Sequence, residues 1–229
     1  WKIVCTLAYR GATKIVMATC EDKNLIVQNF KIKPEKIEIS PNWIDIDTFK
    51  PHKSVTLKNH ILFVGRFTRQ KNLENLIRAV GGTDLILHLV GNGELKRHLK
   101  ALAVEIEAKV EFLGSISNNQ LPSLYNKYEV FVQRSYLEGN PKTLLEAMAC
   151  GAPVVGTNVF GIRNLISHNK NGILTETDAD SLREALLNLS ISPDHQKTLG
   201  KSARETILAN NTLNIYVDTE LKIYKKIIV

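Results

Sequence analysis

Residues 61–90, ILFVGRFTRQKNLENLIRAVGGTDLILHLV, combine two kinds of hydrophobic pattern. The run at 61–64 is short, continuously apolar and followed by glycine, which predicts a strand buried on both faces. Apolar residues then recur with helical spacing over 73–80, and Asn72 is placed to cap that helix. A second apolar run at 85–90 predicts the next strand. The stretch is therefore expected to form a strand–helix–strand unit.

The same alternation continues to about residue 178. Further strands are predicted at 110–113, 130–133, 153–157 and 173–174, with helices at 94–106, from 117 past 125, at 141–150 and at 161–166. Three more helices are predicted at 178–189, 194–209 and 213–228. Because each crossover between parallel strands is right-handed, this order predicts an α/β fold: a Rossmann-like parallel sheet with helices on both faces. Ligands bind such sheets beyond the carboxyl ends of the strands.

The first 50 residues follow a different pattern. Strands are predicted at 14–18 and 36–40, and Thr19 and Asp22 have the spacing of a capping box for a helix through Phe30. A turn-rich connector at 41–51 marks the best candidate for a domain boundary. The chain begins with Trp1 and enters patterned sequence almost at once, so we expect it to be part of a longer protein.

Composition excludes several classes of protein. With 44% hydrophobic and 23% charged residues, the 229-residue chain is neither disordered nor fibrous. Three widely spaced cysteines and six histidines without ligand spacing indicate neither a disulfide framework nor a metal site. The net charge of +7 is compatible with nucleic acid, an anionic membrane surface or phosphorylated small molecules as partners. No RNA-binding signature is present, and a generally basic surface is a better explanation than nucleic-acid binding.

Two glycine-containing turns follow predicted strands. Gly65 and Arg66, with Lys71 nearby, could bind a diphosphate through an arginine fork and a lysine point charge. On spacing alone, solvated loop cations are the favoured interpretation. The sequence Gly-Asn-Gly at 91–93 begins like a dinucleotide fingerprint, but Lys96 occupies the third glycine position, which favours a tight turn and argues against a dehydrogenase.

The segment 138–146 is the strongest candidate site. Asn140 could cap the following helix and Pro141 suits its first position, leaving the amides of residues 142–144 free to hold phosphate. Glu138 in the loop and Glu146 in the helix suit hydrogen bonds to sugar and ribose hydroxyls. The alternative is one surface glutamate and one ordinary helix glutamate. The apolar neighbours of Glu146 favour function, because burying a carboxylate without a ligand is unfavourable.

The stretch 138–157, EGNPKTLLEAMACGAPVVGT, closely resembles the E-x7-E signature of family 4 glycosyltransferases of the GT-B fold. Segments 40–51, 61–72, 89–99 and 110–125 resemble that family in the same order, and the resemblance extends from about residue 14 to the end. It implies three parts: residues 1–50 as the remnant of an N-terminal acceptor domain and linker, residues 51–210 as a nucleotide-sugar-binding Rossmann-like domain, and residues 211–229 as a C-terminal crossover helix. Arg134 stands where the family commonly has proline.

The resemblance also assigns site residues. Arg66 and Lys71 match the pair that holds the donor diphosphate, Glu138 matches the glutamate on the transferred sugar, and these three are the catalytic candidates. Glu146 matches the glutamate that binds ribose hydroxyls. The implied donor-binding set is Gly65, Arg66, Lys71, Gly114, Ser115, Glu138, Gly139, Asn140, Pro141, Lys142, Thr143, Leu144 and Glu146. No metal or other cofactor is expected.

As a member of this family, the protein would be a retaining, hexosyltransferase-like enzyme of polysaccharide biosynthesis. It would move a sugar from a nucleotide-diphosphate donor to a glycan or lipid-linked acceptor. It would be cytoplasmic, with its basic end at 222–226 offering peripheral contact with the inner face of the membrane. The 229-residue stretch alone is expected to bind donor and transfer nothing. The alternative is a stand-alone nucleotide-binding or interaction module without transferase activity.

Overall fold

The predicted strands form one six-stranded parallel sheet, in the order β5-β4-β3-β6-β7-β8. The computed structural model describes residues 1–228. The strands are β3 (Leu57–Val64), β4 (Ile86–Val90), β5 (Val110–Gly114), β6 (Tyr128–Gln133), β7 (Val154–Thr157) and β8 (Ile173–Thr175). The α/β fold class is therefore confirmed, and the strand order places β3 and β6, which are far apart in the chain, side by side.

Helices cover both faces of this sheet because its strands are apolar on both sides. On one face lie α3 (Leu73–Val80), α4 (Lys96–Glu105) and α8 (Ala179–Ser190), packed on residues such as Ile61 and Phe63. On the other lie α5 (Leu121–Lys127), α6 (Lys142–Ala149), the short α7 (Phe160–Arg163) and much of α9 (Pro193–Asn210), packed on residues such as Leu62.

A smaller unit precedes the large sheet. It contains α1 (Lys2–Gly11), which the sequence patterns did not indicate, β1 (Ile15–Met17), α2 (Cys20–Phe30), the 3₁₀ turn η1 (Pro34–Lys36) and β2 (Ile37–Ile39). The strands β1 and β2 pair in parallel, and the Thr19 side chain accepts from the Asp22 amide as the capping box predicts.

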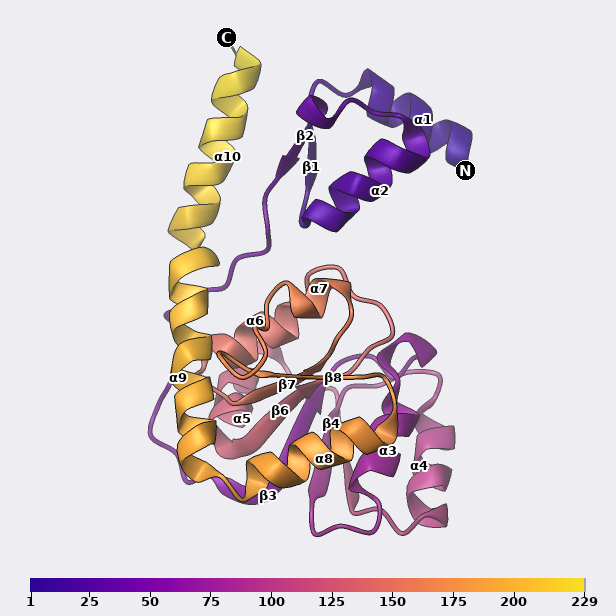
Figure 1. Ribbon diagram of the computed structural model, residues 1–229, viewed down its shortest axis with the longest axis vertical. Coiled ribbons are helices and arrows are strands. Elements are labelled where there is room, and N and C mark those ends of the chain that lie inside the picture. Colours follow the sequence, from indigo (N-terminus) through magenta and orange to yellow (C-terminus); the bar gives the residue numbers. More distant parts are fainter. Residues whose placement is uncertain (229) are drawn as a thin grey trace.

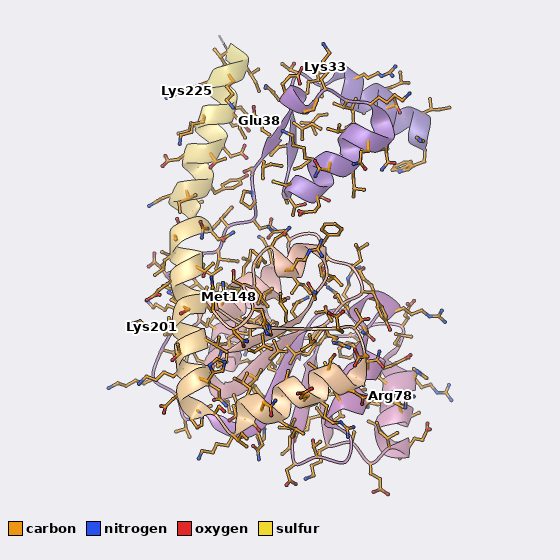
Figure 2. All side chains as sticks on the ribbon, viewed as in Figure 1. Lys33, Glu38, Arg78, Met148, Lys201 and Lys225 are labelled. Atoms are coloured by element: carbon orange, nitrogen blue, oxygen red, sulfur yellow. The ribbon has the colours of Figure 1, made fainter. Side chains whose placement is uncertain are left out.

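The last helix, α10 (Leu213–Ile228), continues the direction of α9, and Figure 1 shows the two as a column along one side of the molecule. The small unit lies beside the upper end of this column and the six-stranded sheet beside its lower end. Near the top, Lys226 contacts Glu38 of β2 at 3.0 Å. Figure 2 labels Glu38 and the preceding residue of α10, Lys225. Across residues 1–228, no helix combines the length and the apolar character needed to cross a bilayer.

Some predicted boundaries and caps were wrong. Helix α4 begins at Lys96, not at residue 94, and the 3₁₀ turn η3 (Asn118–Gln120) precedes α5. Asn72 does precede α3, but its backbone is left-handed (φ 48°) and its side chain makes no capping hydrogen bond. It donates instead to the Thr177 carbonyl at 2.8 Å. A hydrogen bond to a residue distant in the chain thus takes the place of the predicted helix cap.

The Gly-Asn-Gly turn is a packing feature, as its incomplete fingerprint indicated. A Cβ atom at Gly91 would lie 1.9 Å from the Gly65 carbonyl oxygen, and one at Gly93 would lie 2.5 Å from the Phe67 carbonyl oxygen. Only glycine therefore lets the loops after β3 and β4 approach this closely.

Three titratable groups line up across β3, β4 and β5, away from the carboxyl ends of the strands. His60 Nδ1 lies 2.7 Å from His88 Nε2, and His88 Nδ1 lies 3.2 Å from Glu111 Oε2. Burial lowers the pKa of His88 from its usual value; Glu111 opposes this shift, while His60 and Lys127 reinforce it. The folded protein therefore binds fewer protons than the unfolded chain near and below pH 6.5, so acid destabilises it.

We expect the neutral, buried His88 to make the stability of the protein depend on pH. The free energy of unfolding should fall between pH 7.5 and pH 5, and His88→Gln should reduce the size of that fall. Urea unfolding at both pH values measures it, with His195→Gln, at an exposed position, as the control. An equal fall in the parent and in His88→Gln would contradict the assignment.

Candidate functional site

The candidate site lies where the sheet changes direction. Neighbouring strands β3 and β6 continue into helices on opposite faces of the sheet, and parallel α/β sheets bind ligands beyond the carboxyl ends of strands at such a point. The loop after β3 passes through the 3₁₀ turn η2 (Arg69–Lys71), which supplies Lys71. The loop after β6 supplies Glu138. These two residues are 67 positions apart in the chain and form an ion pair there.

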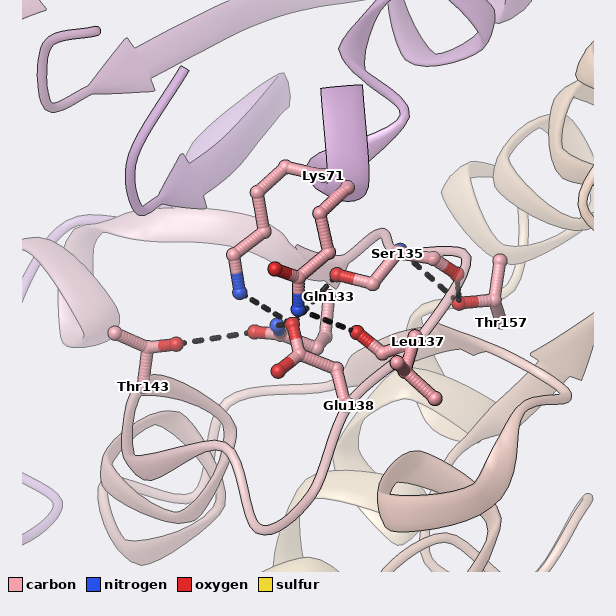
Figure 3. A network of polar contacts seen from close by, with 8 residues as sticks. Lys71, Gln133, Ser135, Leu137, Glu138, Thr143 and Thr157 are labelled. Carbon is pink, nitrogen blue, oxygen red and sulfur yellow. Dashed lines mark hydrogen bonds and ion pairs between the residues drawn. The ribbon is translucent and has the colours of Figure 1, made fainter. Parts of the chain in front are cut away.

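Glu138 is held by three donors on a single oxygen atom (Figure 3). Its Oε1 forms an ion pair with Lys71 Nζ and accepts from Ser135 Oγ at 2.5 Å and from Gln133 Nε2 at 3.1 Å. The Lys71 and Glu138 side chains are only 15% and 9% exposed, so water screens the pair weakly. Its other oxygen, Oε2, has no protein hydrogen-bond partner among residues 1–228, and is available to a ligand hydroxyl.

The network continues into the start of α6. Thr143 Oγ1 donates to Gln133 Oε1 at 3.0 Å, which fixes the orientation of the Gln133 amide toward Glu138. Figure 3 shows Gln133 between Thr143 and Glu138. Of the predicted residues, the structure thus brings together Lys71, Glu138 and Thr143.

The loop carrying Glu138 rests tightly on the segment after β7. The Gly161 amide donates to the Glu138 carbonyl at 3.1 Å, and a Cβ atom on Gly161 would lie 1.6 Å from the Gly139 carbonyl oxygen. Thr157 Oγ1 donates to the Ser135 carbonyl and accepts from the Ser135 amide. The position of Glu138 is therefore set by backbone contacts as well as by its own side chain.

The start of α6 differs from the prediction by one residue. Pro141, not Asn140, occupies the N-cap position, and helical residues begin at Lys142. Asn140 lies one position earlier, where its carbonyl accepts from Asn42 Nδ2 at 2.8 Å. The Leu144 amide already donates to the Pro141 carbonyl at 3.2 Å, and the Leu144 side chain is fully buried. The amides predicted to hold phosphate therefore reduce to those of Lys142 and Thr143.

Glu146 lies about one turn along α6 from its first residue, Lys142. It is 6% exposed, and its Oε2 accepts from the Tyr125 hydroxyl at 2.9 Å. Asn118 Nδ2 is 3.4 Å from its Oε1. Burial raises the pKa of Glu146, while the hydrogen bonds from Tyr125 and Asn118 lower it. The prediction that this carboxylate is buried among apolar neighbours is confirmed.

The remaining predicted residues lie at or after the carboxyl ends of β3 and β5 and do not join the network. Arg66 is exposed, on the loop after β3. Gly114 ends β5 with φ +75°, and its carbonyl accepts from the Gly91 amide at 2.7 Å. The exposed Ser115 follows it, and Gly65 donates its amide to the Val90 carbonyl at 3.0 Å.

Four polar residues of this site were not among those predicted from the sequence. Gln133 and Ser135 hold Glu138, while Tyr125 and Asn118 hold Glu146. A signal existed for Gln133 and Ser135, since they stand at the carboxyl end of a predicted strand, where binding residues gather. No local pattern marks Tyr125, because its spacing from Leu121 and Leu124 in the sequence is that of an ordinary core residue of a helix.

Arg134, between Gln133 and Ser135, points away from Glu138 into the protein. It is 0% exposed and donates to the carbonyls of Glu176 at 2.7 Å and Asp178 at 2.6 Å. Burial lowers its pKa to about 10. The turn before α8 is therefore tied to the same strand end that carries the site.

The chain is similar in sequence to known glycosyl transferases. The family model described as "Glycosyl transferases group 1" matches residues 45–206. An N-acetylgalactosamine-N,N'-diacetylbacillosaminyl-diphospho-undecaprenol 4-alpha-N-acetylgalactosaminyltransferase of Campylobacter jejuni is 35% identical over 214 residues, covering 90% of this chain and 58% of that protein. A UDP-Gal:alpha-D-GlcNAc-diphosphoundecaprenol alpha-1,3-galactosyltransferase of Escherichia coli is 30% identical, covering 80% of this chain and 52% of its own length.

Solved structures share the fold. A sucrose-phosphate synthase from Thermosynechococcus elongatus has a TM-score of 0.90 at 24% identity, covering 99% of this chain and 61% of its own. Anabaena HepE, in complex with UDP and glucose, has a TM-score of 0.87 at 20% identity, covering 99% of this chain and 66% of its own. The chain spans about half the length of the curated relatives it matches.

Proposed function

The chain belongs to the group 1 glycosyl transferases, and on this premise we propose that it forms the donor-binding part of a retaining enzyme. That enzyme would transfer a sugar from a nucleotide-diphosphate donor to a glycan or lipid-linked acceptor. The observation that carries the proposal is the weakly screened Lys71–Glu138 pair at the carboxyl ends of β3 and β6, beside the start of α6.

The geometry suits each part of a nucleotide sugar. The diphosphate would lie among Arg66, Lys71 and the amides of Lys142 and Thr143, where two cations and a helix N-terminus favour negative charge. The free Oε2 of Glu138 would accept a hydroxyl of the transferred sugar. Glu146 would accept ribose hydroxyls, and the backbone near Gly114 and Ser115 would meet the base.

In the transfer step, the bond between the anomeric carbon and the phosphate oxygen breaks, and the nucleoside diphosphate leaves with the electron pair. The acceptor hydroxyl oxygen forms the new bond to that carbon, and its proton passes to the departing diphosphate. Lys71 and Arg66 would stabilise the charge that develops on the diphosphate, because fixed cations in a weakly solvated site act strongly on such charge. The proposal includes no resident metal or other cofactor, and retention of configuration rests on the family resemblance.

The acceptor is proposed by analogy with the relatives whose names include diphospho-undecaprenol. A lipid-linked acceptor would place the enzyme in the cytoplasm at the inner face of a membrane. The basic last turn of α10, with Lys225 and Lys226, supports peripheral contact there, since each cation near an anionic leaflet contributes about 1 kcal/mol.

Arg66→Ala tests the proposed diphosphate site. We expect it to weaken the binding of UDP to this chain by about 1.5–3 kcal/mol, the range for hydrogen bonds to charged groups. Titration calorimetry with UDP and GDP measures the effect. The thermal midpoint should stay near the parent value, because Arg66 is exposed.

Arg78→Ala, which also removes an exposed arginine, is the matched control and should bind as the parent does. Parent-like nucleotide affinity in Arg66→Ala would exclude Arg66 from the diphosphate site. Failure of the parent to bind UDP, GDP or any tested nucleotide sugar would overturn the proposed function itself.

A further inference from the structure

Tyr125 is a core residue with one polar atom directed at the candidate site. It is 2% exposed, and its ring packs edge-on against Phe131, with 5.4 Å between centroids, and lies beside Phe49. The ring is thus held between two aromatic neighbours in the core. The hydroxyl is therefore fixed where it donates to Glu146 Oε2 at 2.9 Å.

The two oxygens of Glu146 differ in how well they are satisfied. Oε2 has the short bond from Tyr125, whereas Oε1 has only the 3.4 Å contact with Asn118 Nδ2. Asn118 belongs to the exposed turn η3, so its side chain can move when a ligand arrives. A buried carboxylate oxygen with one weak donor gains from a second donor, which a ligand hydroxyl can supply.

We propose that Tyr125 is a positioning residue that makes the site selective for nucleotides with an intact ribose diol. This inference rests on the proposed function, in which Glu146 accepts ribose hydroxyls. By occupying Oε2, Tyr125 holds the carboxylate in one rotamer and directs Oε1 toward the bound nucleotide. Selectivity would arise because a ligand lacking the diol leaves Oε1 without a good donor inside a desolvated site.

The experiment compares two ligands that differ only in the diol: UDP and 2′,3′-dideoxy-UDP. Their dissociation constants are measured by calorimetry for the parent chain, Tyr125→Phe, Glu146→Gln and the double variant. The parent should prefer UDP by about tenfold or more, and Tyr125→Phe should reduce that preference at least threefold. In the Glu146→Gln background, adding Tyr125→Phe should leave the preference unchanged, since the group that Tyr125 positions is gone.

Tyr128→Phe is the matched control. Tyr128 is also a buried tyrosine, on β6, but its ring lies beside His60 and His88 and not beside Glu146. The Tyr128→Phe variant should keep the parent's preference for UDP. Tyr125→Phe retains the packed ring, and thermal unfolding of each variant verifies that it is folded.

Measuring the preference for UDP at a series of pH values distinguishes positioning of Glu146 from a general loosening of the core, which would not shift the pH dependence. The hydrogen bond from Tyr125 lowers the pKa of Glu146 against the effect of burial. Without it, the pH above which Glu146 is ionised should rise, and the pH dependence of the UDP preference should shift upward in Tyr125→Phe. An unchanged profile would contradict the positioning role.

The outcomes separate the two proposals. If the parent prefers UDP and Tyr125→Phe keeps the full preference, the inference on Tyr125 is wrong while the proposed function stands. If the parent binds both ligands equally, Glu146 does not bind ribose, and the inference is also wrong. If the parent binds no nucleotide, the proposed function fails, and the selectivity assigned to Tyr125 fails with it.

Discussion

Arg134→Ala is expected to lower the free energy of unfolding by about 3–5 kcal/mol, from the loss of two charge-assisted hydrogen bonds and of a fully buried side chain. The guanidinium is fully buried and donates to the carbonyls of Glu176 and Asp178, and truncation removes both hydrogen bonds. The lost side chain would also leave a cavity beneath the turn before α8. Chemical denaturation of the purified chain, followed by circular dichroism, measures the change.

Arg97→Ala is the control, because Arg97 is exposed on α4 and its loss should change stability by less than about 0.5 kcal/mol. Arg134→Met separates volume from polarity: it restores most of the packing and still leaves both carbonyls unpaired. We expect it to be intermediate between the parent and Arg134→Ala. A loss below about 1 kcal/mol in Arg134→Ala would contradict this structural role of the buried guanidinium.

Lys71→Ala should weaken UDP binding by about 3–4 kcal/mol, more than Arg66→Ala does. Part of the loss is the missing contact with the diphosphate, about 1.5–3 kcal/mol. The rest arises because Glu138, now without its ion-pair partner, places a poorly screened negative charge beside the phosphates. Calorimetry with UDP measures both parts together, and Lys170→Ala, at an exposed position, serves as the control.

A double variant separates the two parts. In Lys71→Ala/Glu138→Gln the repulsive charge is absent, so UDP should bind more tightly than to Lys71→Ala alone and more weakly than to the parent. If the double variant binds no better than Lys71→Ala, the repulsion argument is wrong, and Glu138 lies too far from the diphosphate to influence it.

Much of the fold could be predicted because its signals are local. Each strand of the large sheet is a short apolar run ended by a polar or glycine residue, and each helix has an apolar stripe. The capping of α2 by Thr19 is also local and was predicted correctly. The start of α6 was misplaced by one residue because both Asn140 and Pro141 suit a helix N-terminus, and only the observed dihedral angles distinguish them.

The organisation of the site could be predicted only in part. The resemblance placed Lys71 and Glu138 in one site, but the donors that hold Glu138 come from the end of β6 through tertiary contacts. The conformation of Asn72 had no local signal, because it depends on the Thr177 carbonyl, 105 residues away. The burial of Arg134 was equally hidden, since an arginine in a loop is ordinarily expected at the surface.

The order of the strands has a consequence for how the protein is made. Strand β3 lies between β4, which follows it closely, and β6, which ends at Gln133, 69 residues after Val64. At 5–20 residues per second, a ribosome delivers β6 roughly 3–14 s after β3. Throughout that interval the nascent chain has one unpaired edge on an apolar strand, a surface to which chaperones and other nascent chains bind. Synthesis of β6 closes that edge, and the loop that follows it brings Glu138 to Lys71.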